Sequence, residues 1–218
     1  MERICEAVFI DDRTFWINRP CGSDWLLEYP VVRAACAVDE SIPYWSEIWP
    51  ASRMLAKAIL REPWKSYPKL EALEIACGLG LAGIAALSRG LRVTFSDIDA
   101  FTLRFAAENA ELNGFSDFTT QPIDLRNPPP DLKVPVLFGA DLLYESRLIE
   151  DVAKFIHTVL VPDGMCLIAD PDRLSARPFR KICEGLGLNV ESSFARAGEP
   201  GGERTKGTIY RITHRQRA

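Results

Sequence analysis

The sequence lacks several features that would assign it to a particular protein class. No apolar run approaches the ~18 residues that a membrane-spanning helix needs, and the acidic N-terminus lacks the apolar stretch of a secretion signal. There is no C-x-x-C pair and there are only two histidines, so we expect no metal site. The formal net charge of −4 argues against a surface built for nucleic acid. We therefore expect a cytoplasmic protein with neither a membrane nor a nucleic-acid partner.

What is present suits a globular protein. The chain has 218 residues, of which 47% are hydrophobic and 26% are charged. That length accommodates one α/β domain with a short addition, so we expect an N-terminal extension at residues 1–40 and the main domain at residues 41–218. The six cysteines are expected to be reduced, because nothing else in the sequence indicates secretion.

Strand and helix patterns alternate from residue 70 onward. Before that point we expect one or two short strands within 4–18, a short helix at 23–34 and a helix at 51–61. Later strands are predicted at 70–76, 91–96, 117–122, 134–140, 165–169, 188–195 and 206–213. Helices are predicted at 81–89, 101–113, 147–160 and 176–186, and a turn at 162–164. This alternation predicts a doubly wound, mostly parallel α/β sheet with helices on both faces.

A glycine-rich turn follows the first strand of this alternating region. Gly78, Gly80 and Gly83 form a G-x-G-x-x-G pattern between an apolar strand and a helix, and Asp97 ends the next strand. Glycines let the backbone approach a ligand closely, and a carboxylate at that strand end can accept both hydroxyls of a ribose. The alternatives are a plain tight turn for the glycines and a helix N-cap for Asp97. The combination favours a nucleotide-containing cofactor.

Glu74 bears on which cofactor that is. It stands four residues before Gly78, at the end of the strand. An acid there would repel the pyrophosphate of a dinucleotide but suits the cationic methionyl tail of S-adenosylmethionine. The alternative is that Glu74 caps backbone amides. We therefore expect S-adenosylmethionine, and an NAD(P)-binding protein is the less favoured hypothesis.

These motifs resemble those of class I, seven-strand S-adenosylmethionine-dependent methyltransferases. Residues 74–83, residues 96–99 and Asp124 resemble their motifs I, post-I and III. The D-x-x-Y of residues 141–144 resembles methyltransferase family 16, a group of protein-lysine methyltransferases. Two further pieces, 43–50 (P-Y-W…W-P) and 169–173 (A-D-P-x-R), resemble the branch that includes the electron-transfer-flavoprotein β-subunit lysine methyltransferase and its bacterial relatives. The resemblance spans roughly residues 40–213 and implies a seven-stranded Rossmann-like methyltransferase sheet.

The resemblance also implies a role for each matching residue. Cofactor-binding residues would be Trp49, Glu74, Cys77, Gly78, Gly80, Asp97, Ile98, Asp124, Leu125, Ala140 and Tyr144. Within this set, Asp97 would hold the ribose and Ile98 would lie against the adenine. Leu125 departs from the family, which often has tryptophan there, and so the stacking contact with adenine is in doubt. Catalytic residues would be Asp141, which would face the incoming amine, and Tyr144.

The implied reaction is methyl transfer to a lysine amine of a protein, with S-adenosylhomocysteine as product. A small-molecule N- or O-methyltransferase on the same fold is the alternative. The competing interpretation of Asp141 is a buried cap at the end of a strand. The competing interpretation of Tyr144 and Trp45 is a place in the hydrophobic core. The basic C-terminal stretch, with Arg204, Lys206, Arg211, Arg215 and Arg217, is expected to be a solvated strand and tail, with a docking patch for an acidic protein as the sharper alternative.

Overall fold

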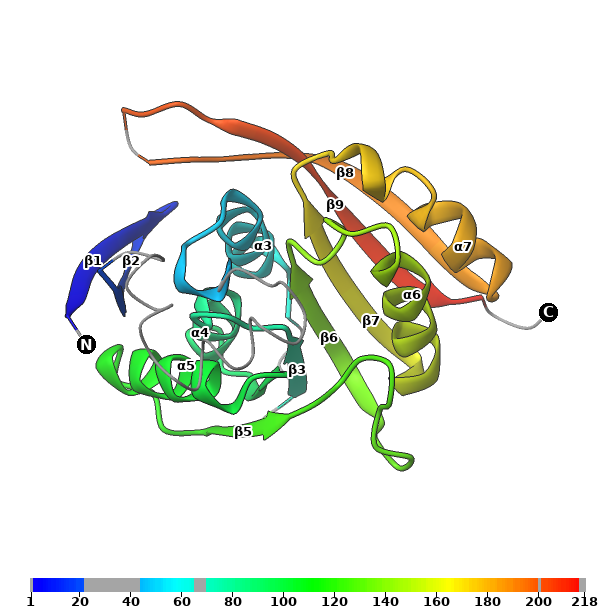
Figure 1. Cartoon of the computed structure of the whole chain (residues 1–218), viewed down its shortest axis with the longest axis horizontal. Coiled ribbons are helices and arrows are strands. Elements are labelled where there is room, and N and C mark those ends of the chain that lie inside the picture. The colour runs from blue at the N-terminus through cyan, green and yellow to red at the C-terminus, as the bar shows by residue number, and fades with distance from the viewer. Residues whose placement is uncertain (1, 22–43, 65–69, 200, 216–218) are drawn as a thin grey trace.

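The computed structural model describes residues 2–21, 44–64, 70–199 and 201–215. Its centre is a seven-stranded sheet with the strand order β5-β4-β3-β6-β7-β9-β8 (Figure 1). The strands are β3 (Glu71–Ile75), β4 (Arg92–Asp97), β5 (Phe118–Pro122), β6 (Val134–Ala140), β7 (Leu160–Asp170), β8 (Leu188–Ala197) and β9 (Thr205–His214). Only β9 runs against its neighbours, being antiparallel to both β7 and β8. This is the seven-strand, Rossmann-like sheet that the sequence predicts.

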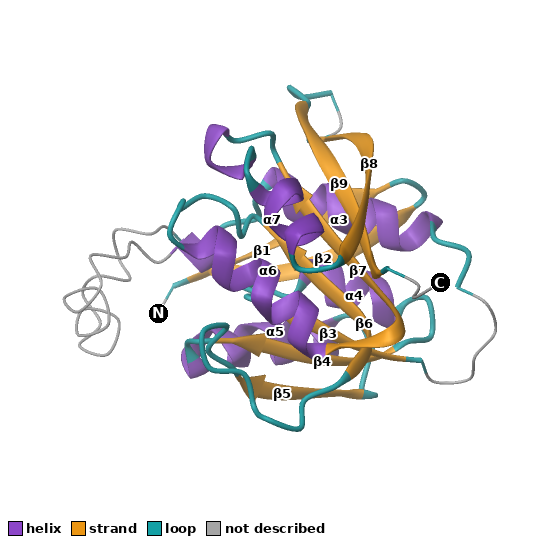
Figure 2. Ribbon diagram, turned by 90° about the vertical axis from the view of Figure 1, so that its right-hand side faces the viewer, coloured by secondary structure: helices purple, strands orange, loops and turns teal. Residues whose placement is uncertain are grey.

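Helices cover both faces of the sheet (Figures 1 and 2). On one face lie α3 (Pro50–Arg61), α4 (Leu81–Leu87) and α5 (Ala100–Leu112), and on the other lie α6 (Leu148–Val159) and α7 (Phe179–Gly185). Side chains of β3 point alternately to the two faces of the sheet. Ala72 packs in the core under α3, α4 and α5, and Leu73 and Ile75 pack in the second core, under α6 and α7. Strands buried on both faces are nearly continuous apolar runs, which is why the central strands were predictable.

A separate hairpin packs beside the sheet on α5. It consists of β1 (Arg3–Ile10) and β2 (Arg13–Pro20), joined by a turn at Asp11-Asp12. Asn109 of α5 accepts from the Asn18 amide at 2.7 Å and donates to the Asn18 carbonyl at 3.1 Å. Asn113 makes the same pair of bonds with Trp16, at 2.9 and 2.7 Å. Two side-chain amides therefore satisfy backbone groups on the free side of β2.

Two predicted boundaries need correction. Residues 162–164 do not form a turn ahead of the strand, because β7 already begins at Leu160. Val134 pairs with Leu160 and Val136 with Met165, so the extra residues form an irregularity inside the strand. Pairing starts early because Leu160 is buried in the second core. The predicted helix at 176–186 begins only at Phe179, since a short 3-10 turn, η2 (Leu174–Ala176), and then Pro178 precede it.

The other predicted strands and helices agree to within a few residues. The predicted helix at 23–34 lies outside the described residues. Across the described parts of the chain, no helix is both long and apolar enough to cross a membrane. Five cysteines are free thiols, and the sixth, Cys36, lies outside the described residues.

Candidate active site

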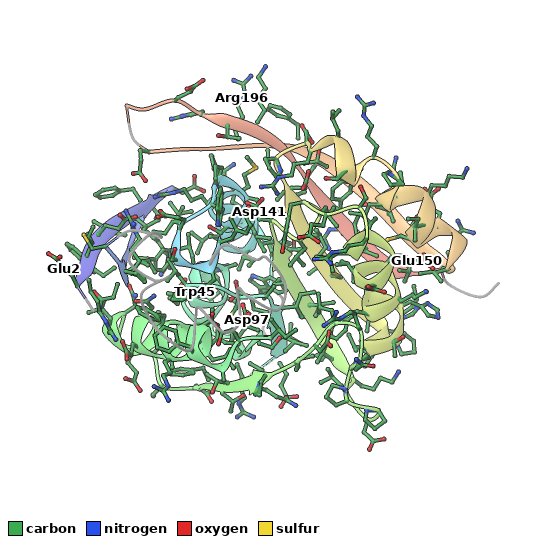
Figure 3. The ribbon with its side chains drawn as sticks, in the orientation of Figure 1. Glu2, Trp45, Asp97, Asp141, Glu150 and Arg196 are labelled. Atoms are coloured by element: carbon green, nitrogen blue, oxygen red, sulfur yellow. The ribbon has the colours of Figure 1, made fainter. Side chains whose placement is uncertain are left out.

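The predicted site residues gather where the parallel strands end. Cys77 and Gly78 follow β3, Asp97 ends β4, and Asp141 follows β6. In Figure 3, Trp45, Asp97 and Asp141 occupy the same region of the view, beside the ends of these strands. Ligands of open α/β sheets bind at this edge, near the point where the strand order reverses. Here that point lies between β3 and β6.

The glycine-rich loop is a tight, left-handed path. Gly78 has a φ of 52° and Gly80 a φ of 80°, and the Gly80 amide donates to the Cys77 carbonyl at 2.8 Å. A Cβ on residue 80 would stand 3.0 Å from Phe95 and 3.1 Å from Ala106. Glycine is therefore needed at residue 80 for both backbone conformation and space. The loop thus lies close against β4 and α5.

The Asp97 side chain is hydrogen-bonded to this loop. Its carboxylate accepts from the Gly78 amide at 3.2 Å and from the Asp99 amide at 3.2 Å. Burial raises the pKa of Asp97 to about 6, against the lowering effect of these amides. Asp99, not Asp97, caps α5, because Asp99 accepts from the Phe101 amide at 2.8 Å. The helix-cap alternative for Asp97 is therefore excluded.

Glu74 lies beneath the loop and faces the N-terminus of α4. Its carboxylate accepts from the Gly83 amide at 2.8 Å, and the side chain is buried. Burial, with a further contribution from the charge of Asp97, raises the pKa of Glu74 to about 8. The structure thus gives Glu74 the amide-capping role that the sequence left open. At neutral pH the side chain is mostly uncharged, so charge repulsion alone does not select the cofactor.

The three residues predicted to lie near the adenine, Ile98, Asp124 and Leu125, differ in their exposure and contacts. Ile98 is 64% exposed and presents an apolar side chain next to Asp97. Asp124 accepts from the amide of Arg126 at 3.0 Å and from its guanidinium at 2.9 Å, which holds the Asp124 pKa below its usual value. Leu125 packs against the second core. Of these residues, Ile98 is the most exposed, and Asp124 and Leu125 are half-buried.

Three aromatic rings line the other side of the site. Tyr44 lies in a 3-10 turn, η1 (Tyr44–Ser46), and its ring centroid is 6.0 Å from that of Trp49 and 5.9 Å from that of Tyr144. The Trp49 indole also donates to the Tyr44 carbonyl at 2.6 Å. Tyr144 is 43% exposed, which excludes the core interpretation for that residue. The rings form a continuous wall from the start of α3 to the loop after β6.

Trp45 belongs to the core instead. Its ring packs against Phe101 and Phe105, with centroid distances of 5.8 and 5.2 Å. Its backbone carbonyl lies 3.4 Å from where a Cβ on Gly78 would stand. The η1 turn therefore borders the glycine-rich loop directly.

An acid–base cluster closes the site at the ends of β6 and β7. Asp141 has a φ of 60°, and its carboxylate accepts from the guanidinium of Arg173. The Arg173 amide donates to the fully buried Asp170 at 2.8 Å. Burial raises the pKa of Asp141, while the positive charge of Arg173 lowers it. Among the described residues, one carboxylate oxygen of Asp141 and one of Asp170 have no hydrogen-bond partner.

Comparisons with known proteins agree with this geometry. A family model described as lysine methyltransferase matches residues 39–179, well over half of the chain. The chain belongs to this lysine methyltransferase family. This methyltransferase uses S-adenosylmethionine, the cofactor that its family and its fold imply. Among curated proteins, no sequence matches it.

Solved structures share the fold of this methyltransferase at low sequence identity. A ribosomal protein L11 methylase from Lactobacillus delbrueckii subsp. bulgaricus has a TM-score of 0.61 and 21% identity, covering 76% of this chain and 79% of its own. A precorrin-6y C5,15-methyltransferase from Geobacter metallireducens has a TM-score of 0.60 and 14% identity, with coverage of 75% and 86%. A TehB-like, S-adenosylmethionine-dependent methyltransferase from Corynebacterium glutamicum has a TM-score of 0.56 and 16% identity, with coverage of 89% and 100%.

The residues of the methyltransferase fit this cofactor. The Asp97 carboxylate is an acceptor suited to ribose hydroxyls, and Ile98 beside it is an apolar surface suited to adenine. Gly78 and Gly80 leave the loop backbone free of side chains. Arg173 and Asp170 were not among the predicted site residues. The D-P-x-R sequence after β7 was their only signal, because a contact between loops of different strands has no local pattern.

Proposed function

We propose that this methyltransferase transfers a methyl group to the lysine amine of a protein. The observation that carries the proposal is a largely buried carboxylate, Asp141, on the loop that also carries Tyr144, whose ring forms an aromatic wall with Tyr44 and Trp49. A carboxylate can accept hydrogen bonds from an amine, and aromatic faces attract an ammonium and accommodate an alkyl stem. Lysine combines these groups.

The solvent exposure of the aromatic wall favours a macromolecular methyl acceptor over a small molecule. Tyr44 and Tyr144 are 46% and 43% exposed, so the acceptor side faces solvent. A small-molecule site would bury most of its ligand within a concave pocket. A side chain presented by another protein needs only a short channel to the reacting atoms.

We assign the cofactor side of the site as follows. When bound, S-adenosylmethionine supplies a methyl group on a positively charged sulfur, which makes that carbon electrophilic. Asp97 would accept from the ribose hydroxyls and Ile98 would cover the adenine, while Asp124 and Leu125 would border its edge. The loop residues Cys77, Gly78 and Gly80 would hold the methionyl part, with Trp49 and Ala140 alongside. Glu74 would act mainly by supporting the loop.

The acceptor side must deliver a neutral amine. An ammonium has no lone pair, and free lysine has a pKa of about 10.4. Partial burial beside the aromatic wall lowers that pKa, and the proton leaves to water. Asp141 would then orient the amine through its hydrogen bonds, and Tyr144 would bound the stem. Alignment and exclusion of water account for most of the catalysis, because the leaving group is already activated.

Labelling tests the proposal directly. The protein is incubated with S-adenosylmethionine that carries a labelled methyl group and with a cell extract depleted of the enzyme, and labelled residues are identified by mass spectrometry. We expect methyl-lysine in one or a few proteins. Label confined to small molecules would replace the protein-lysine assignment with a small-molecule methyltransferase. Asp141→Asn should abolish the signal and leave adenosylhomocysteine affinity unchanged.

A further inference from the structure

The strands β8 and β9 extend past the sheet as a hairpin (Figure 1). The last pair between β7 and β9 joins Asp170 to Thr208, whereas β8 and β9 continue pairing to Ala197 and Thr205. This end of the hairpin lies at the carboxyl end of β7, which is the edge that carries the candidate active site. The extension is therefore placed to meet whatever approaches that site.

The two faces of the extension differ. The inner face rests on the protein: Ile209 and Ala197 are buried, and Glu199 pairs with Arg53 of α3. Side chains alternate along a strand, so Phe194 and Arg196 on β8, with Lys206 on β9, lie on the opposite face. We call these three residues, with Thr208, the outer face. Phe194 is 67% exposed, which is unusual for a large aromatic side chain.

The charges on the outer face are unbalanced. Arg196 stands directly opposite Lys206 in the register, and like charges opposite one another destabilise a sheet. Within the described parts of the chain, no acidic side chain pairs with either residue, and the guanidinium of Arg196 lies 5.2 Å from the Phe194 ring centroid. Figure 3 shows Arg196 at the outer margin of the hairpin. An anionic partner would relieve this repulsion.

The rest of the basic C-terminal stretch is not part of this surface. Arg211 pairs with Glu62, and Arg215 lies at the other end of β9, where its amide donates to Gly187. At ~3.3 Å per residue, the nine-residue separation between Lys206 and Arg215 spans about 30 Å. The charges that can act together at the catalytic edge are therefore those of the outer face, with the neighbouring Arg204.

Hydrogen bonds connect the outer face to the active-site loops. Thr208, opposite Phe194, donates to the Asp172 carboxylate at 2.7 Å, and Asp172 precedes Arg173, which holds Asp141. Two residues after Asp172, Leu174 is 73% exposed. Ser175 then donates to the Leu143 carbonyl at 2.5 Å, next to Tyr144. A chain bound on the outer face thus lies on a continuous scaffold that ends at the aromatic wall.

We propose that the outer face docks an acidic segment of the protein substrate, with apolar side chains against Phe194 and Leu174. The inference rests on the proposed function for its substrate, and the docking itself is tested separately. Charge at the rim of an interface governs encounter rate and salt dependence, and an exposed ring next to it supplies apolar contact area. The site at Asp141 would select lysine, and the outer face would select which lysine.

Fluorescein-labelled poly-L-glutamate is the probe for docking. We expect the wild type to bind it with an affinity that falls as salt is raised, and the double variant Arg196→Glu/Lys206→Glu to bind about tenfold or more weakly. The control, Arg104→Glu/Lys181→Glu, makes the same charge change at two other exposed positions. Equal weakening by both double variants, or none by the first, would overturn the proposal. Unchanged adenosylhomocysteine affinity shows that each variant is folded.

The methylation assay separates the two proposals. With a labelled protein acceptor, the outer-face variant should raise KM about tenfold and leave kcat within twofold, since the residues that contact the amine are intact. An unchanged KM would refute docking while protein-lysine methylation stands. Polyglutamate binding that depends on the outer face, without any methyl-lysine in the wild-type assay, would refute the proposed function and leave the anionic site in place.

Discussion

The Arg173 guanidinium donates to the Asp141 carboxylate, although the two residues are 32 positions apart in the chain. Each follows a different strand, Asp141 after β6 and Arg173 after β7. The pair therefore holds together the loops that follow β6 and β7. It also compensates a carboxylate that burial would otherwise push toward its protonated form.

Removing Arg173 should lower activity through Asp141. In Arg173→Ala, the pKa of Asp141 should rise, because its main lowering influence is gone. The acidic limb of the pH–rate profile should then move to higher pH, and kcat should fall about 10- to 100-fold at neutral pH. Arg173→Lys keeps the charge and should show a smaller shift. An acidic limb that stays in place would show that Arg173 does not act through Asp141.

Asp97→Ala should weaken binding of adenosylhomocysteine by about 10- to 100-fold. The loss corresponds to one hydrogen bond from a ribose hydroxyl to a charged acceptor, which contributes about 1.5–3 kcal/mol. Calorimetric titration measures it. The matched control is Asp99→Ala, which removes the cap of α5 and should cost about 1 kcal/mol of stability with little change in affinity. Unchanged affinity in the Asp97 variant would refute the ribose assignment.

Cofactor binding should depend on pH through Asp97. Its pKa is raised to about 6, so the carboxylate is ionised at pH 7.5 and mostly protonated at pH 5. If the ionised form binds the ribose, the Kd of adenosylhomocysteine should rise up to about tenfold for each pH unit below 6. Titrations at several pH values give the slope. Asp97→Asn should bind adenosylhomocysteine weakly at every pH. If the Kd of the wild type does not change with pH, the ionised Asp97 carboxylate is not the form that binds the ribose.

Glu74 should make the free protein less stable as pH rises. Its pKa in the fold is about 8 against an ordinary value of 4.5, so its contribution to stability is fully present below pH 4.5 and is lost as pH rises to 8. Glu74→Gln keeps an acceptor for the Gly83 amide without a charge. Urea denaturation should show it more stable than the wild type by about 2–4 kcal/mol at pH 8.5, and similar at pH 5. If the free energies of unfolding of Glu74→Gln and the wild type differ by the same amount at pH 5 and pH 8.5, the raised pKa of Glu74 is contradicted.

Tyr144 should act through its ring more than through its hydroxyl. Tyr144→Phe keeps the face that lies 5.9 Å from the Tyr44 ring, and kcat/KM with a protein acceptor should stay within about threefold. Tyr144→Ala removes that face and should lower kcat/KM about tenfold or more. If phenylalanine is as damaging as alanine, the hydroxyl has a direct role in orienting the amine.

Much of the fold was predictable because its signals are local. The buried strand of Leu73 and Ile75 shows as an apolar run, and the Asn113-Gly114 end of α5 shows as a helix-stop pair. The irregularity in β7 was not predictable from the sequence, because consecutive proline, aspartate and glycine residues indicate a turn. Only the pairing with β6 places them inside a strand.

The site was predictable as a set of strand ends but not as a set of contacts. The position of Asp97 follows from the strand–turn–helix order, whereas its bond to the Gly78 amide needs the folded loop. Glu74 illustrates the limit: its residue type suggested a charge for a ligand, but burial leaves it mostly neutral and bound to α4. Desolvation depends on all surrounding elements, so no local pattern contains it.

The η1 turn (Tyr44–Ser46) contacts two parts of the candidate site. Its Trp45 carbonyl borders Gly78 on the cofactor side, and its Tyr44 ring contacts Tyr144 on the acceptor side. The three residues of η1 therefore border the glycine-rich loop on one side and the aromatic wall on the other. A substitution that moves this turn should therefore change cofactor affinity and the position of the Tyr44 ring together.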